Sequence, residues 1–203
     1  MGRRRHGSAG TDRLRMGLRT VETGVVKHLN LQVTPGTPDD VSSAQFLVDG
    51  ARQWLRGRSI DQWQDAIPDL TIRGNAERGE LFVVRRDEDL LAMVTVLDSD
   101  EETWGKQTSS ALYVHRLAIA RDSRGGGVGQ ELLNWVMDRA AEQGREFVRL
   151  DCAADNPGLR FFYERQGFTF VRDVTVPAPT GTRQLKSSLY EYPVLSRPTS
   201  LGV

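Results

Sequence analysis

The sequence predicts one α/β domain, with a mixed central β-sheet of about seven strands and about four flanking helices. The chain has 203 residues, the length of one domain with tails, and 38% of them are apolar, which suffices for a core of ordinary size. Apolar strand-like runs alternate with amphipathic runs of helical period. The predicted order is β-α-α-β-β-β-α-β-α-β-β, which indicates a sheet covered by helices.

The first predicted elements are a short strand and two helices. Residues 29–33 alternate apolar and polar side chains, which is typical of a strand. Thr37 and the proline after it fit a helix start, and an apolar stripe continues this helix to about Gly57. A weaker helix is expected within residues 67–78.

A hairpin and a loop follow. Residues 81–86 and 90–97 are apolar runs joined by a short acidic turn, which predicts two paired strands. Residues 98–110 are polar and acidic, so we expect a loop there.

The second half begins with a strand at residues 111–119, a glycine-rich turn and a helix over residues 128–141 that ends at Gly144. Residues 147–151 show little polar alternation, which is typical of a central strand. Asn156 and the proline after it fit another helix start. The last strands are predicted at residues 168–174 and 189–194. The connection between them, residues 175–186, is predicted to be a loop because it holds two prolines and a glycine.

The glycine-rich turn carries the strongest functional signal. Backbone N–H groups point outward at a helix start, where the macrodipole is positive, and glycine lets a ligand approach that backbone. A ligand with phosphate groups is therefore expected. No Lys-Ser or Lys-Thr follows the glycines, as a P-loop would need, and Gln130 and Leu132 stand where a Rossmann fingerprint would need glycine. Both observations disfavour a nucleotide-binding protein.

What remains, Arg124-x-x-Gly127-x-Gly129, resembles the pyrophosphate loop of the GNAT superfamily of acetyl-CoA-dependent N-acetyltransferases. Downstream, residues 150–156 resemble the fifth strand of that family. Residues 156–168, Asn-Pro-Gly-Leu-Arg-Phe-Phe-Tyr-Glu-Arg-Gln-Gly-Phe, resemble its segment Asn-x-x-Ala-x-x-Phe-Tyr-Glu-x-x-Gly-Phe, with Leu159 in place of the usual alanine. The resemblance covers roughly residues 30–195, is specific for residues 112–170, and implies the GNAT fold.

The resemblance also implies an acetyl-CoA site. The turn and Arg124 would hold the pyrophosphate, the strand before the turn would pair with the pantetheine, and Asn156 would contact the coenzyme. The expected coenzyme-binding residues are Leu117, Ala118, Ile119, Arg124, Gly125, Gly126, Gly127, Val128, Gly129, Gln130 and Asn156.

Tyr163 is the candidate general acid for the departing thiolate. It lies seven residues after Asn156, about two helical turns, so both side chains should share one helix face. The family resemblance implies the same role at this position. The alternative is a core tyrosine beside Phe161 and Phe162.

The acceptor amine must lose a proton, and His115, Tyr113 and Asp151 are the candidates to take it, directly or through water. Histidine has the ordinary pKa closest to neutrality, which favours His115 as the catalytic base, although a structural role is the alternative. Tyr113 and His115 are expected to share a strand face with Leu117 and Ile119.

Two tryptophans are candidates for the acceptor pocket. Trp63 and Trp104 either wall that pocket or cover the sheet. The acidic residues Asp98, Asp100, Glu101 and Glu102 would favour a cationic acceptor if they face it, and otherwise form a solvated loop.

Together these features predict an enzyme that moves an acetyl group from acetyl-CoA to a primary amine of a small molecule, by direct transfer in a ternary complex. Cys152 alternates with Leu150 and Val148, so we expect a core residue rather than a nucleophile. A peptide or protein N-acetyltransferase and a catalytically silent acyl-CoA-binding sensor or scaffold are the alternatives.

Composition bounds the partners. The formal net charge is zero, so neither nucleic acid nor an anionic membrane is expected, and a homodimer is left open. The three histidines and one cysteine show no metal-ligand spacing, so no metal is expected. The single cysteine excludes an internal disulfide and fits a cytoplasmic location. No apolar run reaches the roughly 18 residues of a membrane span.

Tails are expected on both sides of the domain, which is assigned to residues 29–195. Residues 1–28 read as a disordered basic tail without an apolar secretory core, and residues 196–203 as a short C-terminal tail. Met16 is an alternative start.

Overall fold

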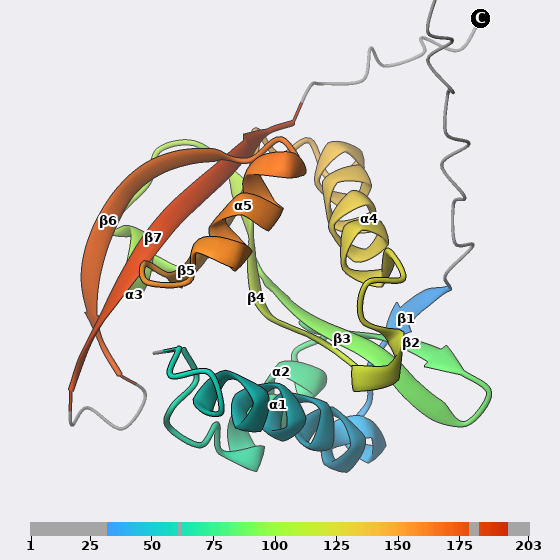
Figure 1. Cartoon of the computed structure of the whole chain (residues 1–203). Helices are drawn as coiled ribbons and strands as arrows, with labels where there is room; N and C mark the ends of the chain where they lie inside the picture. Colours follow the sequence, from blue (N-terminus) through green and yellow to red (C-terminus); the bar gives the residue numbers. More distant parts are fainter. Residues whose placement is uncertain (1–31, 61, 179–182, 195–203) are drawn as a thin grey trace, which may run out of the picture.

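The computed structural model describes residues 32–60, 62–178 and 183–194, and builds one seven-stranded sheet with helices on both faces (Figure 1). In chain order the elements are β1 (Val33–Pro35), the 3-10 turn η1 (Pro38–Asp40), α1 (Val41–Arg56), α2 (Asp69–Glu77), β2 (Leu81–Arg86), β3 (Asp89–Leu97), α3 (Glu101–Trp104), β4 (Ala111–Ile119), the 3-10 turn η2 (Arg121–Ser123), α4 (Val128–Glu142), β5 (Phe147–Ala153), α5 (Pro157–Arg165), β6 (Thr169–Pro177) and β7 (Gln184–Pro193).

The sheet is mixed, with strand order β1-β2-β3-β4-β5-β7-β6. Strands β1 to β4 form an antiparallel meander, and β7 pairs antiparallel with both β5 and β6. Among the described strands only the pair β4–β5 is parallel, because helix α4 carries the chain back between these two strands. The predicted mixed sheet flanked by helices is therefore confirmed.

Two apolar layers hold the helices against the sheet. On one face, α4 and α5 contribute buried residues such as Leu132, Val136 and Tyr163, packed on strands β2 to β5 and on β7. On the other face, α1 and α2 bury residues such as Val48 and Ile72 against β2, β3 and β4. The sheet thus separates the α1–α2 pair from α4, and Figure 1 shows α4 and α5 in the upper part of the view and α1 and α2 in the lower part.

Most predicted elements are present, and the main error is the loop predicted at residues 175–186. Strand β6 continues to Pro177 and β7 begins at Gln184, with these two residues paired in register. A proline is tolerated there because β6 is an edge strand of the sheet, where one side needs no ladder hydrogen bond.

The predicted loop at residues 98–110 also contains structure, the short helix α3. Asp100 caps this helix: its carboxylate accepts a hydrogen bond of 3.2 Å from the Thr103 amide. Charged side chains flank Trp104 in the sequence, yet Trp104 is buried. Composition indicated a solvated loop, but tertiary packing of one tryptophan orders it.

The predicted strand residues Leu29 and Leu31, and both predicted tails, lie outside the described residues. Within the part of the chain that the structure describes, no helix is both long enough and apolar enough to cross a membrane.

Candidate active site

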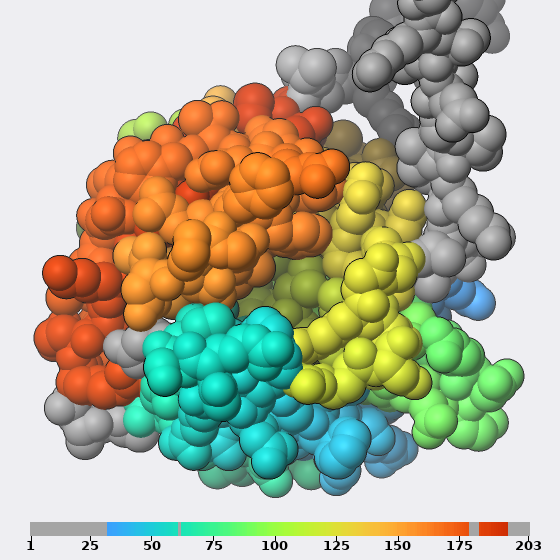
Figure 2. Space-filling view, viewed as in Figure 1, coloured from blue at the N-terminus to red at the C-terminus, as the bar shows by residue number. Residues whose placement is uncertain are grey.

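A large cavity lies where strands β4 and β5 diverge and stop pairing. The parallel pairing ends at Val114 and Leu150. Beyond that point β4 pairs only with β3, and β5 pairs only with β7. The cavity between them has a volume of about 1150 Å³, and Figure 2 shows a hollow between α5, the end of α1 and the glycine turn.

A bulge in β4 sets which side chains enter this cavity. Arg116 has φ of +49°, in the left-handed region that a non-glycine residue seldom adopts, and the β3–β4 register shifts beside it. One extra residue moves the following side chains to the opposite face. Leu117 therefore joins Val114 on the α4–α5 face, while Tyr113 lies on the other face.

The expectation that Tyr113 and His115 share a face with Leu117 and Ile119 is consequently wrong. That expectation requires an unbroken alternation of side chains along β4, and no glycine marks the bulge. His115 nevertheless lines the cavity, because it stands at the point where the sheet opens.

The glycine turn forms one end of the cavity. Gly125 and Gly127 have φ of +77° and +87°, which suit glycine, and Gly127 is the N-cap of α4. The first N–H groups of α4 have no acceptor within the helix, so they remain available to a ligand. Gly129 is needed for a close approach: a Cβ there would lie 3.0 Å from Ile119 Cδ1 and 3.4 Å from Phe162 Cζ.

Most of the predicted coenzyme-binding residues line this one cavity, namely Leu117, Ala118, Ile119, Arg124, Gly125, Gly127, Gly129, Gln130 and Asn156. Two do not. Val128 is buried in the core, and both Val128 and Gly126 line a separate small hollow instead. The expectation that Gly126 and Val128 bind the coenzyme through their backbone amides stays a prediction.

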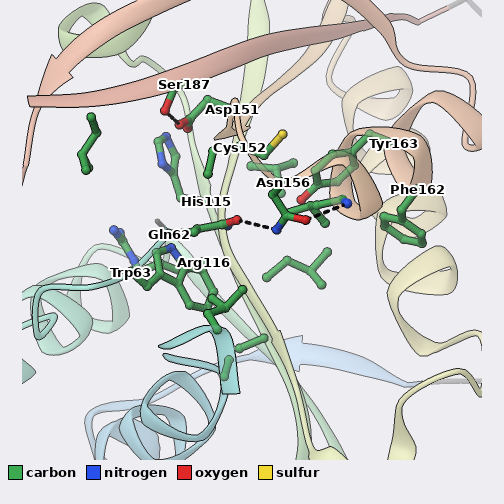
Figure 3. A pocket seen from close by; sticks show the side chains of 18 of the residues that line it. Gln62, Trp63, His115, Arg116, Asp151, Cys152, Asn156, Phe162, Tyr163 and Ser187 are labelled. Atoms are coloured by element: carbon green, nitrogen blue, oxygen red, sulfur yellow. Dashed lines mark hydrogen bonds between the residues drawn. The ribbon is translucent and has the colours of Figure 1, made fainter. Parts of the chain in front are cut away.

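Helix α5 places Asn156 and Tyr163 on the same wall, as their spacing predicts. Asn156 Oδ1 caps the helix by accepting from the Leu159 amide at 3.1 Å, and its Nδ2 donates to Gln62 Oε1 at 3.1 Å (Figure 3). Gln62 comes from the segment between α1 and α2. This bond therefore links α5 to the opposite side of the cavity.

The Tyr163 ring packs in the core, and the residue is 7% exposed. Phe162 and Phe168 lie against the ring, with centroid distances of 5.4 and 5.9 Å. Burial, and then the nearby Cys152 and Asp151, raise the pKa of the Tyr163 phenol. No other described residue forms a hydrogen bond with its hydroxyl. The phenol stays protonated and its hydroxyl is not engaged elsewhere.

Cys152 lines the same wall from β5 but is 2% exposed. Burial raises the pKa of its thiol to about 12, and the Asp151 carboxylate adds to that shift. The thiolate is therefore strongly disfavoured at neutral pH, which fits the predicted core residue.

The other end of the cavity holds a histidine between two carboxylates (Figure 3 shows His115 and Asp151). His115 Nε2 lies 3.2 Å from Asp100 Oδ2, and one donor atom each of Asp100, His115 and Asp151 lies within 4.8 Å of the others. Ser187 Oγ donates to Asp151 Oδ2 at 2.8 Å. Three elements thus converge here: the start of α3, β4 and the end of β5.

The two carboxyls have opposite pKa shifts. Burial alone would raise the pKa of Asp100, but His115 and the Thr103 amide hold it below its usual value. Burial dominates at Asp151 and raises its pKa, although His115 and Ser187 oppose that rise. Asp100 is therefore the stable anion beside the imidazole, while Asp151 takes up a proton more readily.

This trio is also a donor set of one nitrogen and two oxygens that a metal ion could use. Residue spacing gave no sign of it, because the three positions come together only through the fold.

The other residues predicted to contact the acceptor do not lie together in the structure. Trp63 lines the cavity, with φ of +52°, and packs partly against the α1–α2 core. Trp104 and Tyr113 are 2% and 5% exposed, lie in a separate apolar cluster and do not line the cavity. Their predicted contact with the acceptor is therefore corrected.

Trp104 and Tyr113 surround a buried arginine instead. The Arg149 guanidinium lies 5.0 Å from the Trp104 ring centre and donates to the Tyr113 hydroxyl at 3.2 Å. Its Nε also lies 3.3 Å from a Glu191 carboxylate oxygen. These two aromatic residues cover the sheet, the alternative that the sequence had left open for Trp104.

Replacing Trp104 with alanine is therefore expected to lower the free energy of unfolding by about 3–5 kcal/mol, because it empties a buried aromatic site. Acetyl-CoA affinity should stay within about twofold. Urea unfolding and calorimetric titration measure the two effects. Unchanged stability together with a raised KM for the acceptor would contradict this structural role and would indicate that Trp104 contacts the acceptor.

Several residues that line the cavity, among them Arg116 and Ser187, were not identified as site residues from the sequence. Asp100 was noted only as one of several loop acids. Of those acids, Asp100 and Glu102 line the cavity, whereas Asp98 pairs with Arg145. None of these positions carries a local motif, so only a three-dimensional structure could single them out.

Comparison with known proteins agrees with this geometry. A family model described as "Acetyltransferase (GNAT) family" matches residues 48–168. The chain therefore belongs to the GNAT acetyltransferases, and it is an acetyl-CoA-dependent N-acetyltransferase. It is 35% identical over 150 residues to the uncharacterized N-acetyltransferase YesJ of Bacillus subtilis (strain 168), covering 68% of this chain and 81% of YesJ.

Solved structures share the fold. A GNAT-family acetyltransferase from Listeria monocytogenes 4b F2365 superposes with a TM-score of 0.65 at 22% identity, covering 80% of this chain and 94% of that one. The acetyltransferase yncA of Salmonella typhimurium, solved with its cofactor acetyl-CoA, gives a TM-score of 0.62 at 12% identity, covering 84% of this chain and 97% of that one. At these identities the likeness establishes the GNAT fold alone.

Proposed function

We propose that this enzyme acetylates a primary amine of a small molecule, by direct transfer from acetyl-CoA in a ternary complex. One observation carries the proposal: a single cavity joins the glycine turn at one end to His115 at the other, with Tyr163 on the wall. Donor and acceptor can therefore meet in one space.

The end of the cavity at the glycine turn suits acetyl-CoA, a thioester that carries a pyrophosphate. The free amides at the start of α4 and the Arg124 guanidinium offer hydrogen bonds to a pyrophosphate. Beyond Val114, β4 has no partner on its β5 side, so residues 117–119 can pair with the amides of pantetheine as an added strand would. Asn156 stands on the facing wall, where the second N–H of its side-chain amide can bond the coenzyme while the first keeps its bond to Gln62.

The chemistry needs two proton movements. The acceptor nitrogen attacks the thioester carbonyl carbon, and the C–S bond then breaks to release the thiolate. Tyr163 donates a hydrogen bond or its proton to that sulfur and is reprotonated from the proton that the amine has lost. Its raised pKa keeps the phenol protonated until the sulfur becomes basic.

His115 is our candidate for the base. The adjacent Asp100 carboxylate stabilises the imidazolium that forms when the amine gives up its proton. Asp151 and Ser187 lie beside it and can bind the amine as it enters. Tyr113 is no longer a candidate, because it faces the other side of the sheet.

The acceptor is proposed to be small because side chains bridge the cavity. Gln62 bonds Asn156 on one side, and Asp65 Oδ2 lies 3.5 Å from Arg183 Nε on the other. These contacts connect the segment between α1 and α2 to the N-terminal end of α5 and to Arg183, the residue before β7. A lysine on a folded protein would have to displace both, whereas a small amine can enter between them.

The base assignment has a direct test. His115→Gln is expected to lower kcat/KM by about 10²-fold and to change its dependence on pH, because glutamine cannot accept the proton of the amine. The acceptor is first identified by a thiol-release assay with acetyl-CoA against a panel of amines, amino acids, polyamines, aminoglycosides and peptides. Tyr113→Phe is the control and should keep the wild-type pH profile.

A His115→Gln enzyme with the wild-type rate and pH profile would contradict the base role. Cys152→Ser checks the direct mechanism: it should retain turnover, whereas an acyl-cysteine intermediate requires that turnover be lost. Addition of EDTA should not change the rate, and a loss would point to a metal on the Asp100–His115–Asp151 trio.

A further inference from the structure

Three guanidinium groups gather around one indole ring at the rim of the cavity. The guanidinium carbons of Arg58, Arg124 and Arg121 lie 4.1, 4.6 and 5.8 Å from the centre of the Trp54 ring. Trp54 is half-buried near the end of α1 and lines the cavity, while the three arginines are exposed. Cation–π attraction holds these groups near the ring, but the ring contributes no net negative charge.

Within the part of the chain that the structure describes, no carboxylate pairs with this arginine cluster. Among the described residues, Arg58, Arg121 and Arg124 form no ion pair with an aspartate or glutamate. Desolvation, and then the charges of Arg121 and Arg58, lower the pKa of Arg124. Three like charges thus repel one another in a chain whose formal net charge is zero. Such an arrangement costs free energy unless an anion binds there.

The three arginines come from different parts of the fold. Arg58 follows the end of α1, Arg121 opens η2, and Arg124 belongs to the glycine turn. In Figure 2 the end of α1 and the glycine turn meet below the hollow. Arg124 lines the cavity, but Arg58 and Arg121 are not among its lining residues and so stand outside it.

We propose that Trp54, Arg58 and Arg121 form a binding subsite for the 3′-phosphate of coenzyme A. The inference rests on the proposed function, in which the pyrophosphate binds at the glycine turn and Arg124. Coenzyme A carries a separate phosphate on its ribose, on the side of the pyrophosphate away from the thioester. When the thioester lies at Tyr163, that ribose lies outside the turn, where Arg58 and Arg121 stand.

This subsite gives the enzyme a means of selecting its donor. Hydrogen bonds to charged groups are among the stronger ones, but exposure to solvent weakens them here. We therefore expect about a tenfold preference for coenzyme A over dephospho-coenzyme A, which lacks only the 3′-phosphate. Because Arg58 and Arg121 flank the mouth from different elements, the bound phosphate also ties the end of α1 to the glycine turn.

Calorimetric titration with coenzyme A and with dephospho-coenzyme A tests the proposal. The wild type should bind coenzyme A at least about tenfold more tightly, and about 0.5 M sodium chloride should shrink that ratio. Arg58→Gln and Arg121→Gln should each lower the ratio to about threefold or less, with dephospho-coenzyme A affinity within about twofold of wild type. Arg73→Gln is the matched control, because it removes the same charge from an exposed site on α2 without a Trp54 contact, and should keep the wild-type ratio.

Equal affinity of the wild type for both ligands would overturn the subsite while leaving the proposed function intact. Equal weakening of both ligands in the Arg58 and Arg121 variants would also overturn it, because the two guanidinium groups would then bind the pyrophosphate. A wild type that binds neither ligand would instead contradict the proposed function, and the subsite with it. Because both arginines are exposed and the loss of one charge relieves repulsion in the cluster, the variants should melt without ligand no lower than the wild type, which shows that they are folded.

Discussion

Replacing Tyr163 with phenylalanine is expected to lower kcat by at least about tenfold, toward the 10²-fold end of general acid catalysis. In the proposed mechanism the hydroxyl interacts with a charge that exists only as the C–S bond breaks, so its loss raises the barrier without weakening the bound donor. Acetyl-CoA affinity should therefore change by less than about twofold. Steady-state kinetics with an acceptor from the amine screen, together with calorimetric titration, measure both quantities.

The stability of the Tyr163→Phe enzyme should be close to wild type. The ring keeps its packing against Phe162 and Phe168, and no described residue loses a hydrogen bond with the hydroxyl. Tyr190→Phe is a matched control, because its hydroxyl bonds Arg160 and Glu164 and Tyr190 does not line the cavity. Full turnover of Tyr163→Phe, under conditions where chemistry limits the rate, would make Tyr163 a core residue only.

Replacing Gly127 with valine is expected to abolish the stabilisation that acetyl-CoA gives the folded enzyme. A ligand at a hundredfold excess over its Kd stabilises the native state by about 2.7 kcal/mol, or roughly 5–10 °C in Tm for a domain of this size. Valine at φ of +87° strains the turn and places a branched side chain beside the amides that face the pyrophosphate. Thermal unfolding with and without acetyl-CoA measures the shift.

Gly144→Val is the matched control for this experiment. Gly144 has φ of +66° at the other end of α4, and a Cβ there would meet no atom within 4 Å. The control carries similar backbone strain and should still show the full acetyl-CoA shift. Gly129→Val should lose the shift as well, because its side chain would press on Ile119 and Phe162. If the Gly127 and Gly129 variants both bind acetyl-CoA with wild-type affinity, the pyrophosphate site lies elsewhere.

The donor half of the site could be predicted from the sequence because it is local. The strand, glycine turn and helix around Arg124 are contiguous, and their geometry follows from glycine freedom and unpaired helix amides. The same holds for α5, where a capping Asn156, a proline and helical spacing place Tyr163 on the cavity wall. Short-range rules of this kind need no knowledge of distant contacts.

The acceptor half could not be predicted, because distant segments build it. Asp100, His115 and Asp151 meet only when α3, β4 and β5 are assembled. The alternation along β4 also misled the prediction, since a bulge at Arg116 reverses the faces and no turn residue announces it. Tyr113 was therefore expected to face the cavity, but its side chain lies on the other side of the sheet.

Trp104 and the arginine cluster show how much tertiary packing adds to composition. For Trp104 the sequence left open a wall of the acceptor pocket or a cover for the sheet, and packing against the buried Arg149 decides for the second. Likewise Arg58 and Arg121 lie 63 positions apart along the chain (121 − 58), and only the fold brings them to one ring. The sequence by itself determined the family, the order of elements and the glycine turn of the proposed donor site, because each depends on short-range pattern. The acceptor pocket, the β4 bulge and the charge cluster were decided only by long-range contacts, which no single segment encodes.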